Sequence, residues 1–340
     1  GAVFTFDHDL VVTDSTFNGN AAEFEGGALN VVGTGNLIVV NSTLTGNMAQ
    51  GRGGAIVGTF GTVTIVNATI VDNQSIQYSG GGVAMANTGG GNFLTIHNSI
   101  VARNTGNSGD DDILQNNATL TVSHSLIGLN VGTNLMETGP GAPDANGNFI
   151  GGLMAGLIDP LLGPLQDNGG TTFTRALLAG SLALNAGDNS LAVDPSNGST
   201  ALTGDQRGSP FHRIFGGTVD IGAFEDQALI IHGNTAFLTG TPNPDAIVYR
   251  VGPRQIRING VDYVLPSNID MLQVDALDGN DVLNLIGTAA NESGLVRPET
   301  VFFEHNSSHA GYDFTAVDVE TVILDGNGGT DTLTLRDSTT

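Results

Sequence analysis

The stretch Asp14-Ser-Thr-Phe-Asn-Gly-Asn20 decides the fold, because it returns four more times in the first 130 residues. The later copies are Asn41-Ser-Thr-Leu-Thr-Gly-Asn47, Asn67-Ala-Thr-Ile-Val-Asp-Asn73, Asn98-Ser-Ile-Val-Ala-Arg-Asn104 and His124-Ser-Leu-Ile-Gly-Leu-Asn130, each 26 to 31 residues after the one before. A period of this size is typical of a solenoid, in which each unit buries its apolar face only by stacking on the next. We therefore expect the motif to build a scaffold.

Two further signals accompany the motif. A short β-branched run precedes it, as in Leu37-Ile-Val-Val40, and a glycine-rich corner such as Gly53-Gly-Ala-Ile56 follows it. Such runs are typical of strands that meet turns, and glycine permits a tight corner. The sequence therefore predicts an all-β chain whose residues 1–135 form the coils of a right-handed parallel β-helix. We expect two or three strands in each turn of about 27 residues.

The repeat also predicts which side chains stack. One apolar row should lie inside the coils, and it contains Phe17, Leu44, Ile70, Val101 and Ile127. One amide row should lie at a corner, and it contains Asn20, Asn47, Asn73, Asn104 and Asn130. Stacked amides can bond one another and the turn backbone, because each carries two donors and an acceptor. We interpret these asparagines as structural rather than as a glycan or metal site.

The F-x-x-N and G-G-A-[ILV] strings of residues 10–130 resemble the repeats of chlamydial polymorphic membrane proteins and related bacterial surface β-helices. The resemblance implies a β-helix at a bacterial surface, and it implies no activity.

The fourth coil departs from the pattern, because Gly109-Asp-Asp-Asp-Ile113 stands where its siblings have Gly-Gly-Ala or Gly-Gly-Gly. The adjacent carboxylates of Asp110, Asp111 and Asp112 repel one another, so they should face water or share a cation. We expect a solvated corner, with calcium at these three residues as the alternative.

Residues 136–226 form a second region, which begins with the turn-rich Gly139-Pro-Gly-Ala-Pro143. Its strings between Ile158 and Asp188, and then Asp205-Gln-Arg-Gly208 and Val219-Asp-Ile-Gly-Ala-Phe-Glu225, resemble the choice-of-anchor domain at the end of bacterial extracellular β-helices. The resemblance implies an exported protein of a Gram-negative or planctomycete-like bacterium, and gives no reaction. We expect this segment to cap the last coil, pinned by a buried pair between Arg207 and a carboxylate.

Residues 227–340 contain tandem β-rich acidic units, in which residues 269–285 align with residues 319–335. Both units hold Asp-x5-Asp before a strand, and such glycine-rich acidic loops resemble degenerate hemolysin-type calcium repeats. The resemblance implies Ca²⁺ as a cofactor, although tandem nonapeptides are absent. The calcium candidates are Asp275, Asp278, Asp281, Asp325, Asn327 and Asp331. The alternative is that Asp and Gly only shape turns.

The composition narrows the function classes. A formal net charge of −24 repels nucleic acid and anionic membrane surfaces. The absence of cysteine excludes disulfides, zinc–thiolate sites and cysteine nucleophiles. We expect no membrane-spanning segment, because no window is long and apolar enough. The chain starts at Gly1 without a signal peptide, so we expect a processed piece of a longer polypeptide.

Three functions remain open. The first is a non-enzymatic extracellular or cell-surface protein, structural or adhesive, that self-associates into a filament or layer or binds other surface proteins or glycans. The second is a polysaccharide lyase or glycoside hydrolase, but the coils offer only Arg52 and Arg103 as bases and Asp72 with Asp110–Asp112 as paired carboxylates. The third is a passive glycan-binding module, which needs an exposed Tyr78 or Tyr312. We assign no catalytic residue.

Overall fold

The computed structural model describes residues 1–86, 91–107, 109–178, 180–209, 211–215, 217–240, 244–259, 261–277, 279–297, 300–304 and 314–336. Within these ranges the chain is all-β apart from two short 3-10 helices, η1 (Asn189–Leu191) and η2 (Pro195–Asn197), and neither could cross a membrane. It divides into two compact units, the first made of Gly1–Gly208 and His212–Asp226 and the second of Ser209–Phe211 and Gln227–Thr340.

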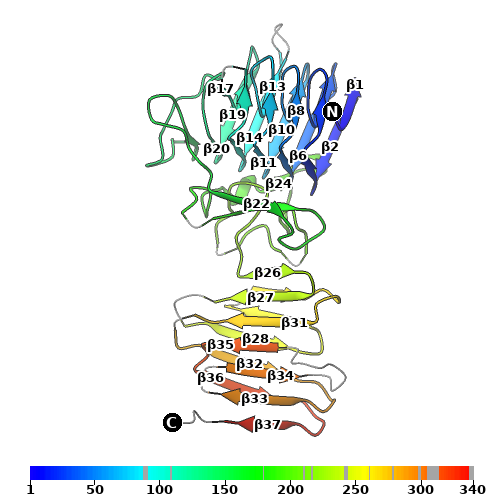
Figure 1. Ribbon diagram of the computed structural model, residues 1–340, viewed down its shortest axis with the longest axis vertical. Coiled ribbons are helices and arrows are strands. Elements are labelled where there is room, and N and C mark those ends of the chain that lie inside the picture. Colours follow the sequence, from blue (N-terminus) through cyan, green and yellow to red (C-terminus); the bar gives the residue numbers. More distant parts are fainter. Residues whose placement is uncertain are drawn as a thin grey trace. The chain divides into compact units, whose positions relative to one another are not determined.

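Four stacked sheets run through the described coils of the first unit, and most of their strands recur with the motif (Figure 1). Sheet A holds β1 (Val3–Phe6), β5 (Leu29–Val32), β9 (Ile56–Gly58), β13 (Val83–Met85) and β18 (Ile113–Leu114). Sheet B holds β2 (Leu10–Thr13), β6 (Leu37–Val40), β10 (Thr62–Val66), β14 (Phe93–His97) and β19 (Thr119–Ser123). Sheet C holds β3 (Thr16–Asn18), β7 (Thr43–Thr45), β11 (Thr69–Val71), β15 (Ile100–Ala102), β20 (Leu126–Ile127) and β21 (Phe149–Ile150). Sheet D holds β4 (Ala21–Ala22), β8 (Met48–Ala49), β12 (Gln74–Ser75), β16 (Thr105–Gly106) and β17 (Gly109–Asp110).

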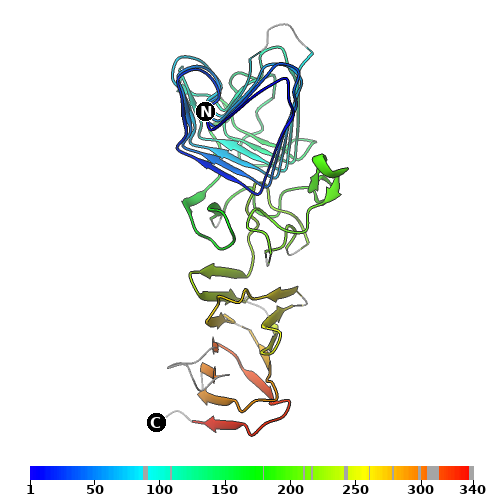
Figure 2. The same ribbon diagram turned by 90° about the vertical axis from the view of Figure 1, so that its right-hand side faces the viewer.

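The neighbouring strands of these sheets pair in parallel, except that β17 pairs antiparallel with β16. A complete turn of the chain contributes four strands, so the prediction of two or three is wrong. The additional strands are the two-residue pieces β4, β8, β12 and β16, which follow the last asparagine of the motif and are too short to show as an apolar run. Figure 2 shows the successive turns following similar paths around a common interior, an arrangement compatible with a parallel β-helix.

The interior of the first unit is filled by side chains that strand pairing brings into register from turn to turn. One such row contains Phe17, Leu44, Ile70, Val101, Ile127 and then Ile150. All six belong to or pack against the main apolar cluster, and Leu44, Ile70 and Val101 are fully buried. Burial of one such side chain contributes roughly 2 kcal/mol, so the stacked row is a principal source of stability.

The first residue of each motif forms the corner between sheets B and C in the left-handed conformation. Asn41 and Asn67, for example, have φ of 45° and 47°. Asn and Asp tolerate this region better than other residues with a side chain, which explains their place at the start of the motif. The glycine corner has a different cause, because a Cβ at Gly54 would lie 2.2 Å from the carbonyl oxygen of Gly81 in the next turn.

The second residue of the motif forms a serine ladder that sequence reasoning missed. Ser42 Oγ accepts the N–H of Ser15 at 3.1 Å, and Ser125 Oγ accepts the N–H of Ser99 at 3.1 Å. Ser99 Oγ accepts the N–H of Ala68 at 3.0 Å. The recurrence of Ser at this motif position was the available signal, and Ala68 interrupts the ladder because it carries no hydroxyl.

Residues 158–226 lie along the outer face of sheet C. They contain β22 (Leu162–Gln166), β23 (Thr174–Leu177), η1, β24 (Val193–Asp194), η2 and β25 (Thr200–Ala201). Ile158, Leu177 and Phe224 share an apolar cluster with outward residues of sheet C such as Ile100 and Leu126. The sequence predicts a cap for this segment, whereas these contacts describe a lateral cover.

The second unit contains two sheets within the described residues. The first, in spatial order, holds β26 (Leu229–His232), β27 (Thr235–Thr239), β31 (Met271–Asp275), β35 (Phe314–Val317), β34 (Thr300–Glu304), β33 (Ser293–Arg297) and β37 (Thr332–Leu335). The second holds β30 (Val261–Val264), β29 (Gln255–Ile258), β28 (Ala246–Arg250), β32 (Val282–Ile286) and β36 (Thr321–Asp325). The parallel series β27–β31–β35 and β28–β32–β36 show that this unit also stacks repeats, with hairpins inserted between them.

We expect Ala68→Ser to stabilise the first unit by about 1 kcal/mol, because the new hydroxyl would restore the serine ladder and accept the N–H of Ser42. Urea denaturation followed by circular dichroism measures the change. Ala118→Ser is the control, since Ala118 is buried but lies outside the ladder. If both substitutions destabilised the protein equally, the serine ladder would not contribute to its stability.

Candidate functional site

The asparagines that end four of the motifs form a hydrogen-bonded ladder. Asn20 donates both its N–H and its Nδ2 to Oδ1 of Asn47, at 3.0 and 2.8 Å. Asn47 donates both groups to Oδ1 of Asn73 at 2.9 Å, and Asn73 does the same to Asn104 at 3.0 and 2.9 Å. Each amide thus satisfies the corner backbone of the preceding turn, where an unpaired N–H would be costly.

The same amides also bond the chain inside the turn. Asn73 Nδ2 donates to the carbonyl oxygens of Leu44 and Val71, each at 3.0 Å. Asn47, Asn73 and Asn104 are buried. No polar atom of these three side chains therefore faces solvent, and the row offers little for a ligand to bind.

The ladder ends on Asp112. Its Oδ1 accepts the N–H and Nδ2 of Asn104, both at 2.9 Å, and its Oδ2 accepts the N–H of Leu129 at 2.8 Å. A carboxylate suits this place because both of its oxygens accept, whereas an amide would point one donor at the Leu129 N–H. Burial raises the pKa of Asp112 from the ordinary 3.8 to about 7, against these hydrogen bonds, which lower it.

Asn130 does not continue the ladder. Its N–H bonds the carbonyl oxygen of Gly151 at 2.9 Å, and its Nδ2 bonds that of Leu135. The chain turns away after Leu129 without adding another strand to sheets A and D, so Asp112 takes the position that sequence periodicity assigns to Asn130.

The acidic corner of the fourth coil is not a solvated one at Asp111 and Asp112, because both residues are buried. Their backbone carbonyls accept the N–H groups of Gly81 and Gly82, so the two aspartates occupy the glycine positions of the preceding turn. Burial also raises the pKa of Asp111. Asp110 belongs to β17 through its backbone.

Two buried arginines hold the lateral cover. Arg207 donates Nε and Nη2 to Oδ2 of Asp205 at 3.0 and 2.7 Å, which confirms the predicted buried pair, and its guanidinium lies 3.9 Å from the ring centre of Phe224. Arg213, which sequence reasoning missed, pairs with Glu225 at 2.8 Å. Burial raises the pKa of Glu225 despite that arginine. These ion pairs are fully enclosed and therefore serve the fold.

In the second unit, the second Asp of each Asp-x5-Asp frame lies at a corner between stacked strands. Asp281 Oδ1 accepts the N–H of Asp245 at 2.7 Å, and Asp331 Oδ1 accepts the N–H of Glu292 at 3.1 Å. Glu320 Oε2 in turn accepts the N–H of Asp281 at 2.6 Å. These carboxylates do for the second unit what the asparagine ladder does for the first, and Glu320 and Glu292 were not among the sequence candidates.

The first Asp of each frame closes a turn. Asp275 Oδ1 accepts the N–H of Leu277 at 3.1 Å, and Asp325 Oδ1 accepts the N–H of Asn327 at 3.0 Å. Such contacts two residues apart are those of an Asx turn. Asp278 lies outside the described residues. Within the part of the chain that the structure describes, no three His, Asp or Glu side chains gather into a group that could hold a metal ion.

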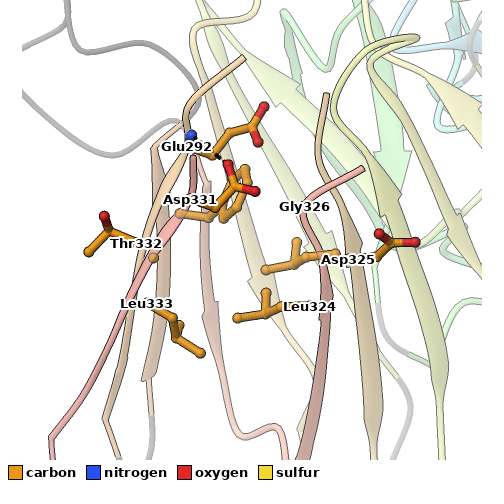
Figure 3. Close-up of a pocket in the computed structure, with 10 residues that line it drawn as sticks. Glu292, Leu324, Asp325, Gly326, Asp331, Thr332 and Leu333 are labelled. Atoms are coloured by element: carbon orange, nitrogen blue, oxygen red, sulfur yellow. Dashed lines mark hydrogen bonds between the residues drawn. The ribbon is translucent and has the colours of Figure 1, made fainter. Parts of the chain in front are cut away.

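A cavity of about 230 Å³ lies beside these corners and is drawn in Figure 3. Leu285, Phe303, Leu324 and Leu333 give it apolar walls, and Glu292 and Asp331 also line it. Figure 3 shows Asp331 next to Glu292, whereas the Asp325 carboxylate points away from Leu324. The cavity therefore does not draw the calcium candidates together around one point.

The residues that a carbohydrate-active enzyme would use are engaged elsewhere. Arg52 pairs with Glu25 at 3.2 Å. Arg103 pairs with Asp72 at 2.8 Å, and Arg175 also reaches Asp72, at 2.7 Å. Neither arginine of the coils is thus a free base, and Asp72 lies between two cations.

Comparison with known proteins adds no assignment, because no family model, no curated protein and no solved structure matches this chain.

We expect Asn73→Leu to destabilise the first unit by about 3 kcal/mol or more, because it leaves the N–H of Asn47 and the carbonyls of Leu44 and Val71 buried without the amide. Thermal melting measures the loss. Asn20→Leu is the matched control and should cost less, since Asn20 is partly exposed at the first rung. An unchanged melting temperature for Asn73→Leu would contradict the ladder.

The raised pKa of Asp112 predicts a pH dependence. Between pH 3.8 and about 7 the folded protein keeps a proton that the unfolded chain has released. This contribution to stability is therefore complete below pH 3.8 and disappears as the pH rises through about 7, over a range of up to about 4 kcal/mol. Urea titrations at pH 4.5 and 7.5 should show a smaller difference for Asp112→Asn than for the native protein. The same difference in both would rule out Asp112 as the titrating group.

Proposed function

We propose that this protein is a non-enzymatic extracellular surface protein with a structural or adhesive role, built on a right-handed parallel β-helix solenoid. The observation that carries the proposal is the internal use of the repeated polar side chains. The asparagine and serine of the motif bond the neighbouring turn, and the corner carboxylates of the second unit do the same. Repeated side chains whose hydrogen-bonding groups are used inside the protein have a structural role and are not placed to bind a substrate.

The surface location is supported by sequence resemblance. Residues 10–130 resemble repeats of bacterial surface β-helices, and residues 158–225 resemble a choice-of-anchor domain. The net charge of −24 keeps such a protein soluble and disfavours nucleic acid as a partner. The partners that fit are further copies of the chain, other surface proteins, or glycans.

The rival function, a polysaccharide lyase or glycoside hydrolase, has little support from the side chains that it requires. A lyase needs a base and a cation that face the substrate, but Arg52 and Arg103 are held in ion pairs. A hydrolase needs two carboxyl groups across a cleft, but Asp112 is buried at the end of the ladder and Asp72 is paired with two arginines.

Calcium is retained as a proposed ligand of the acidic corners in the second unit. It would have to replace the backbone N–H groups that Asp281 and Asp331 now accept, or bridge the second oxygen of the exposed Asp331 to a further molecule, since that of Asp281 is buried. Its expected effect is therefore on assembly and stiffness more than on the fold of one chain.

Light scattering and electron microscopy of the purified chain, with calcium and with a chelator, test the proposal. We expect end-to-end or side-to-side assemblies, or attachment to isolated bacterial envelopes, and no release of reducing sugars from polysaccharides. A protein that stays monomeric in both conditions and binds no envelope would contradict the structural and adhesive role. Release of reducing sugars would instead support the rival function of a carbohydrate-active enzyme.

A further inference from the structure

A groove of about 450 Å³ crosses the outer face of sheet B in the first unit. It passes over β2, β6 and β10, which lie side by side in Figure 1, and Pro195 and Ser196 of η2 also line it. Because it crosses the strands, the groove follows the stacking direction of the turns. Neighbouring strands are about 4.8 Å apart, so each strand adds one outward position to a row at that interval.

Two rows of outward side chains line this groove. The first is Asp9, Asn36 and Thr62, and the second is Val11, Ile38 and Thr64. In the first row Asp9 Oδ1 accepts the N–H and Nδ2 of Asn36 at 2.8 and 3.1 Å, and Asn36 Oδ1 accepts the N–H of Thr62 at 3.0 Å. This polar row is therefore held in place by the scaffold, as the internal ladders are.

Each row retains one unused hydroxyl group. Among the described residues, no protein group bonds the hydroxyls of Thr62 and Thr64, and both side chains are partly exposed. The second row adds apolar surface, and Val11 is 48% exposed. The groove therefore combines fixed polar groups with apolar surface, and a sugar offers both hydroxyl groups and apolar C–H faces to such a lining.

The next strand carries the line of the groove onto an aromatic ring. Phe93 of β14 is the register partner of Thr62 and is 49% exposed. The groove and this ring together cover four strands, a span of about 14 Å. An exposed phenyl face is a good partner for the C–H face of a sugar ring, because both surfaces are apolar and flat.

The charges decide which sugar fits. Among the described residues no basic side chain lines the groove, Asp9 lies in it, and the chain carries a net charge of −24. An anionic polysaccharide would therefore be repelled. We propose that the groove and Phe93 bind a neutral linear oligosaccharide, which makes the adhesive role proposed above specific for glycans and rests on it.

Isothermal titration with four neutral probes tests the proposal: cellohexaose, laminarihexaose, mannohexaose and chitohexaose, with polygalacturonate as the anionic contrast. We expect at least one neutral probe to bind and polygalacturonate not to bind. Phe93→Ala should weaken binding about tenfold through the loss of stacking. Thr64→Gln, which fills the groove from a partly exposed strand position, should weaken it as much while the melting temperature stays unchanged.

Phe24→Ala is the matched control, because Phe24 is also an exposed phenylalanine but follows β4 and does not line the groove. Its affinity should equal that of the native protein. The groove would be ruled out if none of the four neutral probes binds, or if Phe93→Ala binds like the native protein. Attachment to bacterial envelopes that persists in Phe93→Ala would leave the adhesive role standing and remove only the groove. If the native protein itself does not attach to bacterial envelopes, the adhesive role is ruled out.

Discussion

The structure of the first unit depends on one constraint, which is that the backbone N–H groups at the corner of the asparagine ladder must find acceptors in the next turn. The amide of Asn73 meets this constraint in both directions, because it accepts from Asn47 and donates to Asn104. Neither a longer nor a purely apolar side chain could fill that role without leaving a backbone N–H unpaired. The spacing of the motif can therefore vary between 26 and 31 residues, because the corner amides stay in register even across the longest interval, from Asn73 to Asn104.

The same constraint explains where the pattern changes. A ladder of amides cannot end on another amide when the final partner is an N–H, so Asp112 closes it with two accepting oxygens. In the second unit, the carboxylates of Asp281, Glu320 and Asp331 accept backbone N–H groups between stacked strands, as the amides do in the first unit. The acidic repeats that resemble calcium loops thus have a hydrogen-bonding role that needs no metal. Calcium binding there would require these oxygens to exchange one partner for another.

Much of the scaffold could be predicted from sequence because its contacts repeat. The row from Phe17 to Ile127 and the rungs from Asn20 to Asn104 follow from a single period, and the all-β architecture follows with them. Asp112 could not be predicted, because an aspartate run is usually solvated and only the departure of the chain after Leu129 brings this one inside. The position of the lateral cover also could not be predicted from the sequence. Its contacts join residues as distant as Thr43 and Gln206, with no period to signal them.

The outer faces of the sheets limit where the first unit can bind anything. Sheet C is covered by the apolar residues of segment 158–226. On sheet A the outward row runs from Phe4, which is 63% exposed, to Val57 and Ala84, which are fully buried. On sheet B the corresponding positions include Val11, Thr64 and Phe93, which keep part of their surface accessible. The internal ladders make the same kind of hydrogen bond in every turn. Substitutions at the outward positions of sheet B can therefore change ligand binding without breaking these ladders. A binding face that varies over a constant core is the arrangement expected of an adhesive repeat protein.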